Sequence, residues 1–110
     1  MWKEDVGVYQ IKCKSNEKIY IGSSMRIKER WYRHRKNLRS GYHSNKVLQS
    51  DWNKYGESDF EFSVLERCSR NQQYAYEQKY LDLLQPFLDN GKGYNKLHYT
   101  GFSKCQTIEN

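Results

Sequence analysis

The sequence has one proline, three cysteines and no long apolar segment. Cys13, Cys68 and Cys105 lie far apart and form no CxxC pair, and the three histidines add no metal-ligand spacing. A disulfide scaffold or a zinc knuckle is therefore not expected. No apolar run approaches the roughly 18 residues of a membrane span, and the N-terminus has no apolar signal segment. We therefore expect a soluble cytoplasmic protein that makes no membrane contact.

Apolar residues are also scarce, but aromatic residues are not. Hydrophobic residues make up 36% of the 110 positions, yet 15% are aromatic, including ten tyrosines and three tryptophans. Intrinsically disordered chains are poor in aromatic residues, so this composition indicates a folded protein with an aromatic-rich core. The length fits a single domain.

Positive charge is concentrated in the first half of the chain. The net charge is +6, and residues 1–55 contain 13 Lys or Arg and 5 Asp or Glu, whereas residues 56–110 contain 6 and 8. Seven basic residues, one acid and two aromatic residues fall in the segment Arg26–Arg39. This mixture is typical of a nucleic-acid-binding surface, because an ordinary solvent-exposed helix face usually mixes its charges. The candidate DNA-contacting residues are Arg26, Lys28, Arg33, Arg35, Lys36 and Arg39.

Hydrophobic periodicity predicts an α+β domain, with a small three-stranded antiparallel sheet flanked by helices. Strand patterns lie at residues 6–13, 18–22 and 59–68, and the first two form a hairpin. Helical spacing is found at residues 26–38, 44–55 and 71–84, which end near Gly41, Gly56 and Pro86. The second helix is expected to turn one apolar side toward the core, formed by Val47, Leu48, Trp52 and Tyr55.

Several polar residues could carry chemistry. Arg30 and His34 are four residues apart and so share a helix face, where a guanidinium can bind a phosphate and an imidazole can accept a proton. Ordinary exposure on a basic helix explains the same pair equally well. Glu77 lies on the apolar stripe of its helix, so a divalent metal ion or an internal arginine must compensate its charge. Asn95, beside two glycines, is either a turn residue or a fixed amide donor.

The opening hairpin places a tyrosine close to a glycine on each strand. Tyr9 lies near Gly7, and Tyr20 lies near Gly22. The period of two allows both rings to project from one face of the sheet, with the glycines leaving room for a phosphate or a backbone to come close. The alternative is that both rings simply fill the core, since tyrosine favours strands.

The ordered motifs resemble the catalytic domain of the GIY-YIG nuclease superfamily. The residues that carry the resemblance are "GVY" at Gly7–Tyr9, "YIG" at Tyr20–Gly22, "ERWYRH" with Arg30 and His34, Glu77, and "GYN" with Asn95. The segment from Glu29 to Gly56 is most similar to the homing-endonuclease branch, and His43 matches a histidine of that branch. Valine in place of the isoleucine of the first motif is a small change at a β-branched position.

The resemblance implies a metal-dependent DNA endonuclease that leaves 5′-phosphate and 3′-hydroxyl ends. Tyr9 would activate the attacking water, with His34 as proton acceptor, and Tyr20 would position the water or the phosphate. The pKa of a free tyrosine is near 10, so a tyrosine base needs nearby cations.

The remaining site residues are assigned in the same way. Arg30 would stabilise the developing charge, Glu77 would be the protein ligand of one Mg²⁺ or Mn²⁺ ion, and Asn95 would orient the site. No small-molecule cofactor is implied, and the cellular setting would be a bacterial or phage-infected cytoplasm.

Homing enzymes of this branch carry a separate DNA-binding region, so we expect residues 1–97 to form the nuclease domain and residues 98–110 a tail or the start of a linker. The expected partner is DNA, with sequence targeting supplied by a domain outside this chain. Two other functions stay open at this stage: a non-catalytic nucleic-acid-binding module on the same fold, and a protein-interaction domain with an aromatic surface.

Overall fold

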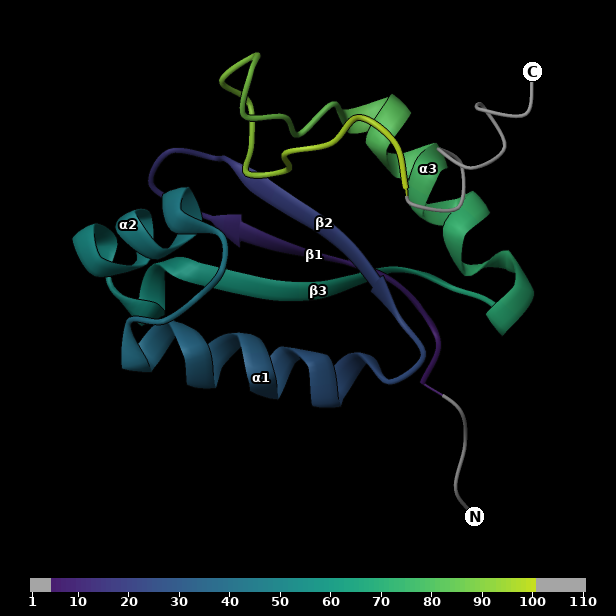
Figure 1. Cartoon of the computed structure of the whole chain (residues 1–110), viewed down its shortest axis with the longest axis horizontal. Coiled ribbons are helices and arrows are strands. Elements are labelled where there is room, and N and C mark those ends of the chain that lie inside the picture. Colours follow the sequence, from purple (N-terminus) through teal and green to yellow (C-terminus); the bar gives the residue numbers. More distant parts are fainter. Residues whose placement is uncertain (1–4, 101–110) are drawn as a thin grey trace.

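The computed structural model describes residues 5–100 and contains a three-stranded antiparallel sheet with three main helices (Figure 1). The strands are β1 (Gly7–Cys13), β2 (Ile19–Ser24) and β3 (Phe60–Arg67), in the order β2-β1-β3. The helices are α1 (Ile27–Ser40), α2 (Lys46–Tyr55) and α3 (Gln73–Leu84). The predicted fold class is confirmed. No helix in the described part of the chain has the length and apolar character needed to cross a membrane.

The central strand β1 supplies side chains to two separate cores. Tyr9 and Ile11 pack with residues of α1 and α2 on one face of the sheet, whereas Val8 packs with Leu81 of α3 on the other face. Figure 1 shows α1 and α2 on one side of the strands and α3 on the opposite side. This alternation follows from the period of two in a strand, and it fixes which face carries the hydroxyl of Tyr9.

One of the four residues predicted to form the apolar side of α2 does not face the core. Leu48 and Trp52 are buried and Tyr55 packs at the edge of the same core, but Val47 is 37% exposed, so its predicted burial is wrong. The inward position is taken by Gln49, which is buried. A polar side chain can occupy this position because all its hydrogen-bonding groups meet partners from neighbouring segments.

Two glycines of the hairpin make room for protein atoms. A Cβ at Gly7 would lie 2.2 Å from the carbonyl oxygen of Glu66, where the pairing of β1 with β3 shifts register. A Cβ at Gly22 would lie 2.6 Å from the hydroxyl of Tyr9. The expectation that backbone comes close is confirmed at Gly7, whereas Gly22 leaves space for a tyrosine hydroxyl that the sequence did not indicate.

The segment after α3 returns to the free edge of β2. The amide of Tyr94 donates to the carbonyl of Ile19 at 2.9 Å. The side chain of Asn95 accepts from the Ile21 amide at 2.8 Å and donates to the Ile21 carbonyl at 2.9 Å. Asn95 thus binds β2 as a neighbouring strand would, and it covers part of an otherwise open sheet edge.

Residues 98–100, which fall in the predicted tail or linker, lie against α3. The side-chain amide of Gln78 donates from Nε2 to the carbonyl of His98, and its Oε1 accepts from the backbone amide of Thr100, each at 2.9 Å. The rest of that predicted segment, with Cys105, lies outside the described residues.

Replacing Gly22 with alanine tests this packing. The added methyl group would overlap the Tyr9 hydroxyl, so we expect the free energy of unfolding to fall by about 1–3 kcal/mol, the usual cost of overpacking a core. Urea unfolding measures the change, with Val47→Ala as a control that should stay within about 0.5 kcal/mol of wild type. Equal stability of Gly22→Ala and wild type would show that Tyr9 does not lie under Gly22.

Candidate active site

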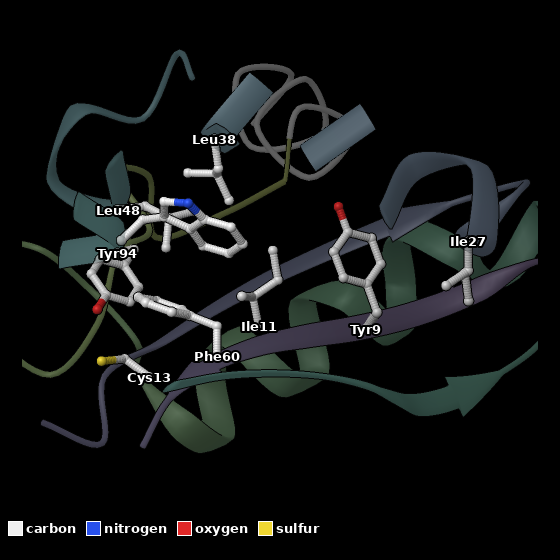
Figure 2. Close-up of a cluster of buried hydrophobic side chains, with 9 residues drawn as sticks. Tyr9, Ile11, Cys13, Ile27, Leu38, Leu48, Phe60 and Tyr94 are labelled. Atoms are coloured by element: carbon white, nitrogen blue, oxygen red, sulfur yellow. The ribbon is translucent and has the colours of Figure 1, made fainter. Parts of the chain in front are cut away.

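A buried chain of hydrogen bonds connects β1 to the loop between α1 and α2. The Tyr9 hydroxyl lies 2.8 Å from Nε2 of His34, and Nδ1 of His34 lies 2.8 Å from Nε2 of His43. The two imidazole rings are stacked, with centroids 5.0 Å apart. Tyr9 has no exposed surface, and Figure 2 shows it among the buried apolar side chains, near Ile11 and Ile27. Tyr9 is therefore a core residue as well as a site residue, and the alternative of ordinary exposure does not hold for His34.

Two residues that were not predicted hold His43 in place. The backbone amide of Asn45 donates to Nδ1 of His43 at 3.0 Å, and the backbone amide of His43 donates to Oε1 of Gln49 at 3.0 Å. Gln49 also donates to the carbonyl of Leu38 at the end of α1. The side chain of Asn45 caps α2 by accepting from the Leu48 amide. The loop that carries His43 is thereby tied to both helices.

Tyr20, Arg30 and Glu77 come together between two adjoining cavities. One cavity of about 440 Å³ lies beside α1 and the segment after α3, and another of about 400 Å³ lies beside the start of α3; both are lined by these three residues. Tyr9 lines the second cavity, and the rings of Tyr9 and Tyr20 are 6.5 Å apart. His34 lines the first cavity. The structure thus brings all six predicted catalytic residues to these cavities, with Asn95 on the first.

Glu77 is half-buried, and one oxygen of its carboxylate is held by a hydrogen bond. Its Oε1 accepts from the hydroxyl of Ser23 at 2.5 Å, and Gln73 donates to the same hydroxyl at 3.2 Å. Burial raises the pKa of Glu77, although Ser23 and the charge of Arg30 act in the opposite direction. The structure contains no ion pair between Glu77 and an arginine within residues 5–100, so the internal salt bridge is not formed there.

The guanidinium of Arg30 acts on four titratable residues of the site, namely Tyr9, Tyr20, His34 and Glu77. Burial raises the pKa of Tyr9 and of Tyr20, and the positive charge of Arg30 partly offsets both increases. Burial lowers the pKa of His34 to about 3, with His43 and Arg30 adding to the effect. At neutral pH both tyrosines therefore carry their protons and His34 is uncharged.

The basic residues of α1 divide between two sides of the helix. Arg26 and Arg33 line cavities together with Arg30. Arg35 instead stacks on the ring of Phe62, 4.1 Å from its centroid. Arg39 forms a two-pronged ion pair with Glu57, and Lys28 and Lys36 are exposed. Two of the six predicted DNA-contacting residues thus lie beside the site.

Asn95 lines the first cavity, but its side chain binds the protein backbone. Both functional groups of its amide bind the backbone of Ile21, between Tyr20 and Gly22. The side chain is buried and supports β2 through its oxygen and one of its two N–H groups. This geometry supports the orienting role.

One carboxylate is available to a metal ion. Glu77 is the only acid that lines either of these two cavities in the described part of the chain, and residues 5–100 contain no cluster of three or more His, Cys, Asp or Glu side chains that could form a protein cage. Mg²⁺ usually takes one or two carboxylates, several waters and oxygen atoms of a substrate phosphate. The donor set therefore fits Mg²⁺ or Mn²⁺ held jointly by Glu77, water and a phosphate.

Sequence patterns indicated some of the unpredicted residues better than others. An asparagine directly before a helix is a common N-cap, so Asn45 could have been identified. Ser23, Gln73 and Arg70 carry no comparable signal, because they reach the site only through contacts between β2 and the region around the start of α3.

The buried His34 predicts how stability depends on pH. The unfolded state binds a proton near the ordinary histidine pKa of 6.5, whereas the folded state binds it only near pH 3. Between these values the unfolded state holds more protons, so the free energy of unfolding should fall as the pH falls, by up to about 1.4 kcal/mol per pH unit.

Urea unfolding between pH 4 and 7, of wild type and His34→Gln, measures this contribution. In His34→Gln, the slope of the free energy of unfolding against pH should lose the contribution of about one proton. Leu38→Val should be less stable at every pH with the slope unchanged. A His34→Gln slope equal to that of wild type would contradict the buried neutral histidine.

Comparisons with known proteins agree with the ordered motifs. Residues 5–95 match the GIY-YIG catalytic domain. The chain is 36% identical over 101 residues to intron-associated endonuclease 1 of Enterobacteria phage T4, and the alignment spans 92% of this chain but only 40% of that protein.

Solved structures give the same relationship. The catalytic domain of the homing endonuclease I-TevI is 35% identical with a TM-score of 0.73, covering 84% of this chain and 99% of that domain. A mutant of that domain is 34% identical with a TM-score of 0.73, covering 89% and 98%. These matches confirm the resemblance drawn from the motifs at Gly7–Tyr9 and Tyr20–Gly22, and the chain belongs to the family of GIY-YIG catalytic domains.

Proposed function

We propose that this chain is the catalytic domain of a DNA endonuclease of homing type, which uses Mg²⁺ or Mn²⁺ to hydrolyse phosphodiester bonds. The observation that carries the proposal is the meeting of Tyr20, Arg30 and Glu77 between two cavities, next to the buried Tyr9 and His34. The relatives described above are endonucleases, and the I-TevI domain is matched over nearly its full length.

The shape and charge of the site suit a nucleic-acid strand. The two cavities share three residues, and a third cavity of about 320 Å³ shares Arg30 with both. Arginine and lysine side chains line all three, including Arg33, Lys96 and Arg70. A continuous cationic path of this kind binds phosphates without reading bases, so sequence targeting would belong to another domain.

Hydrolysis forms a bond between a water oxygen and phosphorus, breaks the bond from phosphorus to the 3′ oxygen, and moves one proton from the water to that oxygen. The products are a 5′-phosphate and a 3′-hydroxyl. Arg30 would donate two hydrogen bonds to the phosphate oxygens and stabilise their growing charge. Tyr20, which lines both cavities, would hold the water or the phosphate.

Glu77 would hold the metal ion. A bound Mg²⁺ or Mn²⁺ would supply a second positive charge to the scissile phosphate. Ser23 and Gln73 would fix the orientation of the carboxylate, and Asn95 would hold β2 so that Tyr20 keeps its position. His43 would act through His34.

Plasmid nicking tests the metal role of Glu77. In Mg²⁺ or Mn²⁺ the wild type should nick supercoiled DNA, and EDTA should stop the reaction. Glu77→Gln should lower the rate by at least about 100-fold, because an amide of equal size is a much weaker ligand for a hard cation. Asp82→Asn, on the exposed side of the same helix, is the matched control and should leave the rate unchanged.

Equal nicking by Glu77→Gln and wild type would overturn the metal role. DNA binding with no cleavage in either metal would identify the chain as a non-catalytic nucleic-acid-binding module.

The two sides of α1 give a second prediction. Arg33→Gln should weaken DNA binding and reduce the slope of log affinity against log salt by about one, because it removes a phosphate contact beside the site. Arg35→Gln should change both much less, since Arg35 lies on Phe62. Fluorescence anisotropy with a duplex at several salt concentrations measures both, and a larger effect for Arg35 than for Arg33 would place the DNA on the other side of the helix.

A further inference from the structure

We propose that the cavity of about 400 Å³ beside the start of α3 is a subsite for the nucleotide next to the scissile phosphate. In this subsite Arg70 binds the adjoining phosphate, and the ring of Tyr74 lies against the deoxyribose between the two phosphates. The placement relative to the scissile phosphate rests on the proposed function, whereas the phosphate contact of Arg70 is testable without cleavage.

One face of the segment from Arg70 to Glu77 is turned toward this cavity. Four residues of the segment line the cavity at a spacing of three or four positions, which puts them on one side of a helix. They are Arg70, Gln73, Tyr74 and Glu77. The short 3-10 turn Arg70–Gln72 leads directly into α3, so the face continues from one into the other. The proposed metal ligand Glu77 therefore shares its face with an arginine and a tyrosine.

This face is tied to the sheet at its centre. Gln73 is buried, and its Nε2 donates to the hydroxyl of Ser23 in β2 at 3.2 Å. A capping box closes the turn that precedes it. The start of α3 and the turn from β2 into α1 lie at the same end of the sheet, and both line the cavity (Figure 1). Arg70 and Tyr74 thus extend from a backbone that is held against the strand beside the site.

The charges on the cavity wall favour more than one phosphate. Within residues 5–100, Arg30 and Arg70 are the two cations that line the cavity and Glu77 is its only acid. In the proposed function Arg30 binds the scissile phosphate and Glu77 holds the metal ion, so the guanidinium of Arg70 is left for a second anion. A DNA strand carries one negative charge on every nucleotide, so the adjoining phosphate is the nearest anion that Arg70 meets.

Two exposed side chains with apolar surface lie on the walls of the same cavity. Tyr74 is 44% exposed and Met25 is 50% exposed. The bases of a duplex are paired and stacked inside it, so a cavity that receives a phosphate also receives the neighbouring sugar. Contact between the apolar face of a deoxyribose and an aromatic ring removes apolar surface from water. The ring of Tyr74 is therefore assigned to the sugar.

Fluorescence anisotropy with a duplex in EDTA tests the phosphate contact without cleavage. Arg70→Gln should weaken binding about tenfold and reduce the slope of log affinity against log salt by about one. Lys79→Gln removes the same charge from α3 but lines none of the three cavities, so it should leave both quantities close to those of wild type. Equal effects of the two substitutions would overturn the subsite, because Arg70 would then act only through net charge.

Substitutions at Tyr74 test the sugar contact. Tyr74→Phe keeps the ring and should nick DNA as wild type does, whereas Tyr74→Ala should slow nicking several-fold with the salt slope unchanged, since the ring carries no charge. Tyr32→Ala, at an exposed tyrosine of α1 that lines none of the three cavities, is the matched control and should nick as wild type. Equal losses in Tyr74→Phe and Tyr74→Ala would show that the ring makes no such contact.

Nicking at one mapped bond tests which phosphate Arg70 binds. The wild type in Mg²⁺ or Mn²⁺ first identifies a nicked bond in a defined duplex, and a neutral methylphosphonate then replaces the phosphate on its 5′ side or on its 3′ side. On one of the two sides, the neutral group should slow nicking of that bond by the wild type about tenfold at protein concentrations below the Kd. It should have no further effect in Arg70→Gln, where the contact is already lost, and Lys79→Gln should respond as wild type does.

Additive effects of Arg70→Gln and of the neutral group on both sides would overturn the assignment of Arg70 to the adjoining phosphate. If the wild type does not nick DNA but Arg70→Gln weakens binding as predicted, the proposed nuclease function fails while the phosphate contact of Arg70 stands.

Discussion

The buried hydrogen bond between Tyr9 and His34 is the contact on which the site depends. It joins the central strand to α1, and it is formed inside the larger of the two cores, where an unpaired hydroxyl or imidazole would be costly. Both partners are therefore held by packing as well as by the bond. Gly22 is needed so that the hydroxyl has space, and the stacked His43 completes the pairing of His34.

Arg30 is the electrostatic centre around this contact. It lines all three cavities and acts on Tyr9, Tyr20, His34 and Glu77. Its charge offsets part of the effect of burial on the three acidic groups, but it does not pair with Glu77. Arg30 and Glu77 are thus left as a cation and an anion on the same cavity walls, which suits a site that receives both a phosphate and a metal ion.

Much of the fold followed from short-range sequence patterns. Alternation in β1 separates Tyr9 and Ile11 from Val8, and helical spacing in α1 places Ile27 and Leu38 in the core, because both patterns depend only on local geometry. The ordered motifs identified the family. The sequence left open whether Tyr9 fills the core, since its burial depends on how α1 covers the sheet.

The features that the sequence patterns did not predict depend on contacts between segments far apart in the chain. Ser23 reaches Glu77 across 54 residues. Gln49 replaces Val47 on the inner side of α2 because the loop before α2 and the end of α1 offer it partners. The basic residues of α1 looked equivalent in sequence. The packing of Arg35 on Phe62 and the ion pair of Arg39 with Glu57 separate these two arginines from those beside the site. Such features arise from tertiary structure and leave no periodic signal.

The most direct test of the central claim is the chemistry of the ends that this chain leaves on DNA. A nicked plasmid produced by the wild-type protein in Mg²⁺ or Mn²⁺ is treated with DNA ligase and, separately, analysed for terminal phosphate. Attack of water that displaces the 3′ oxygen predicts nicks that ligase seals directly, with a 5′-phosphate and a 3′-hydroxyl. Nicks that carry a 3′-phosphate, or intact plasmid in both metals, would contradict the account.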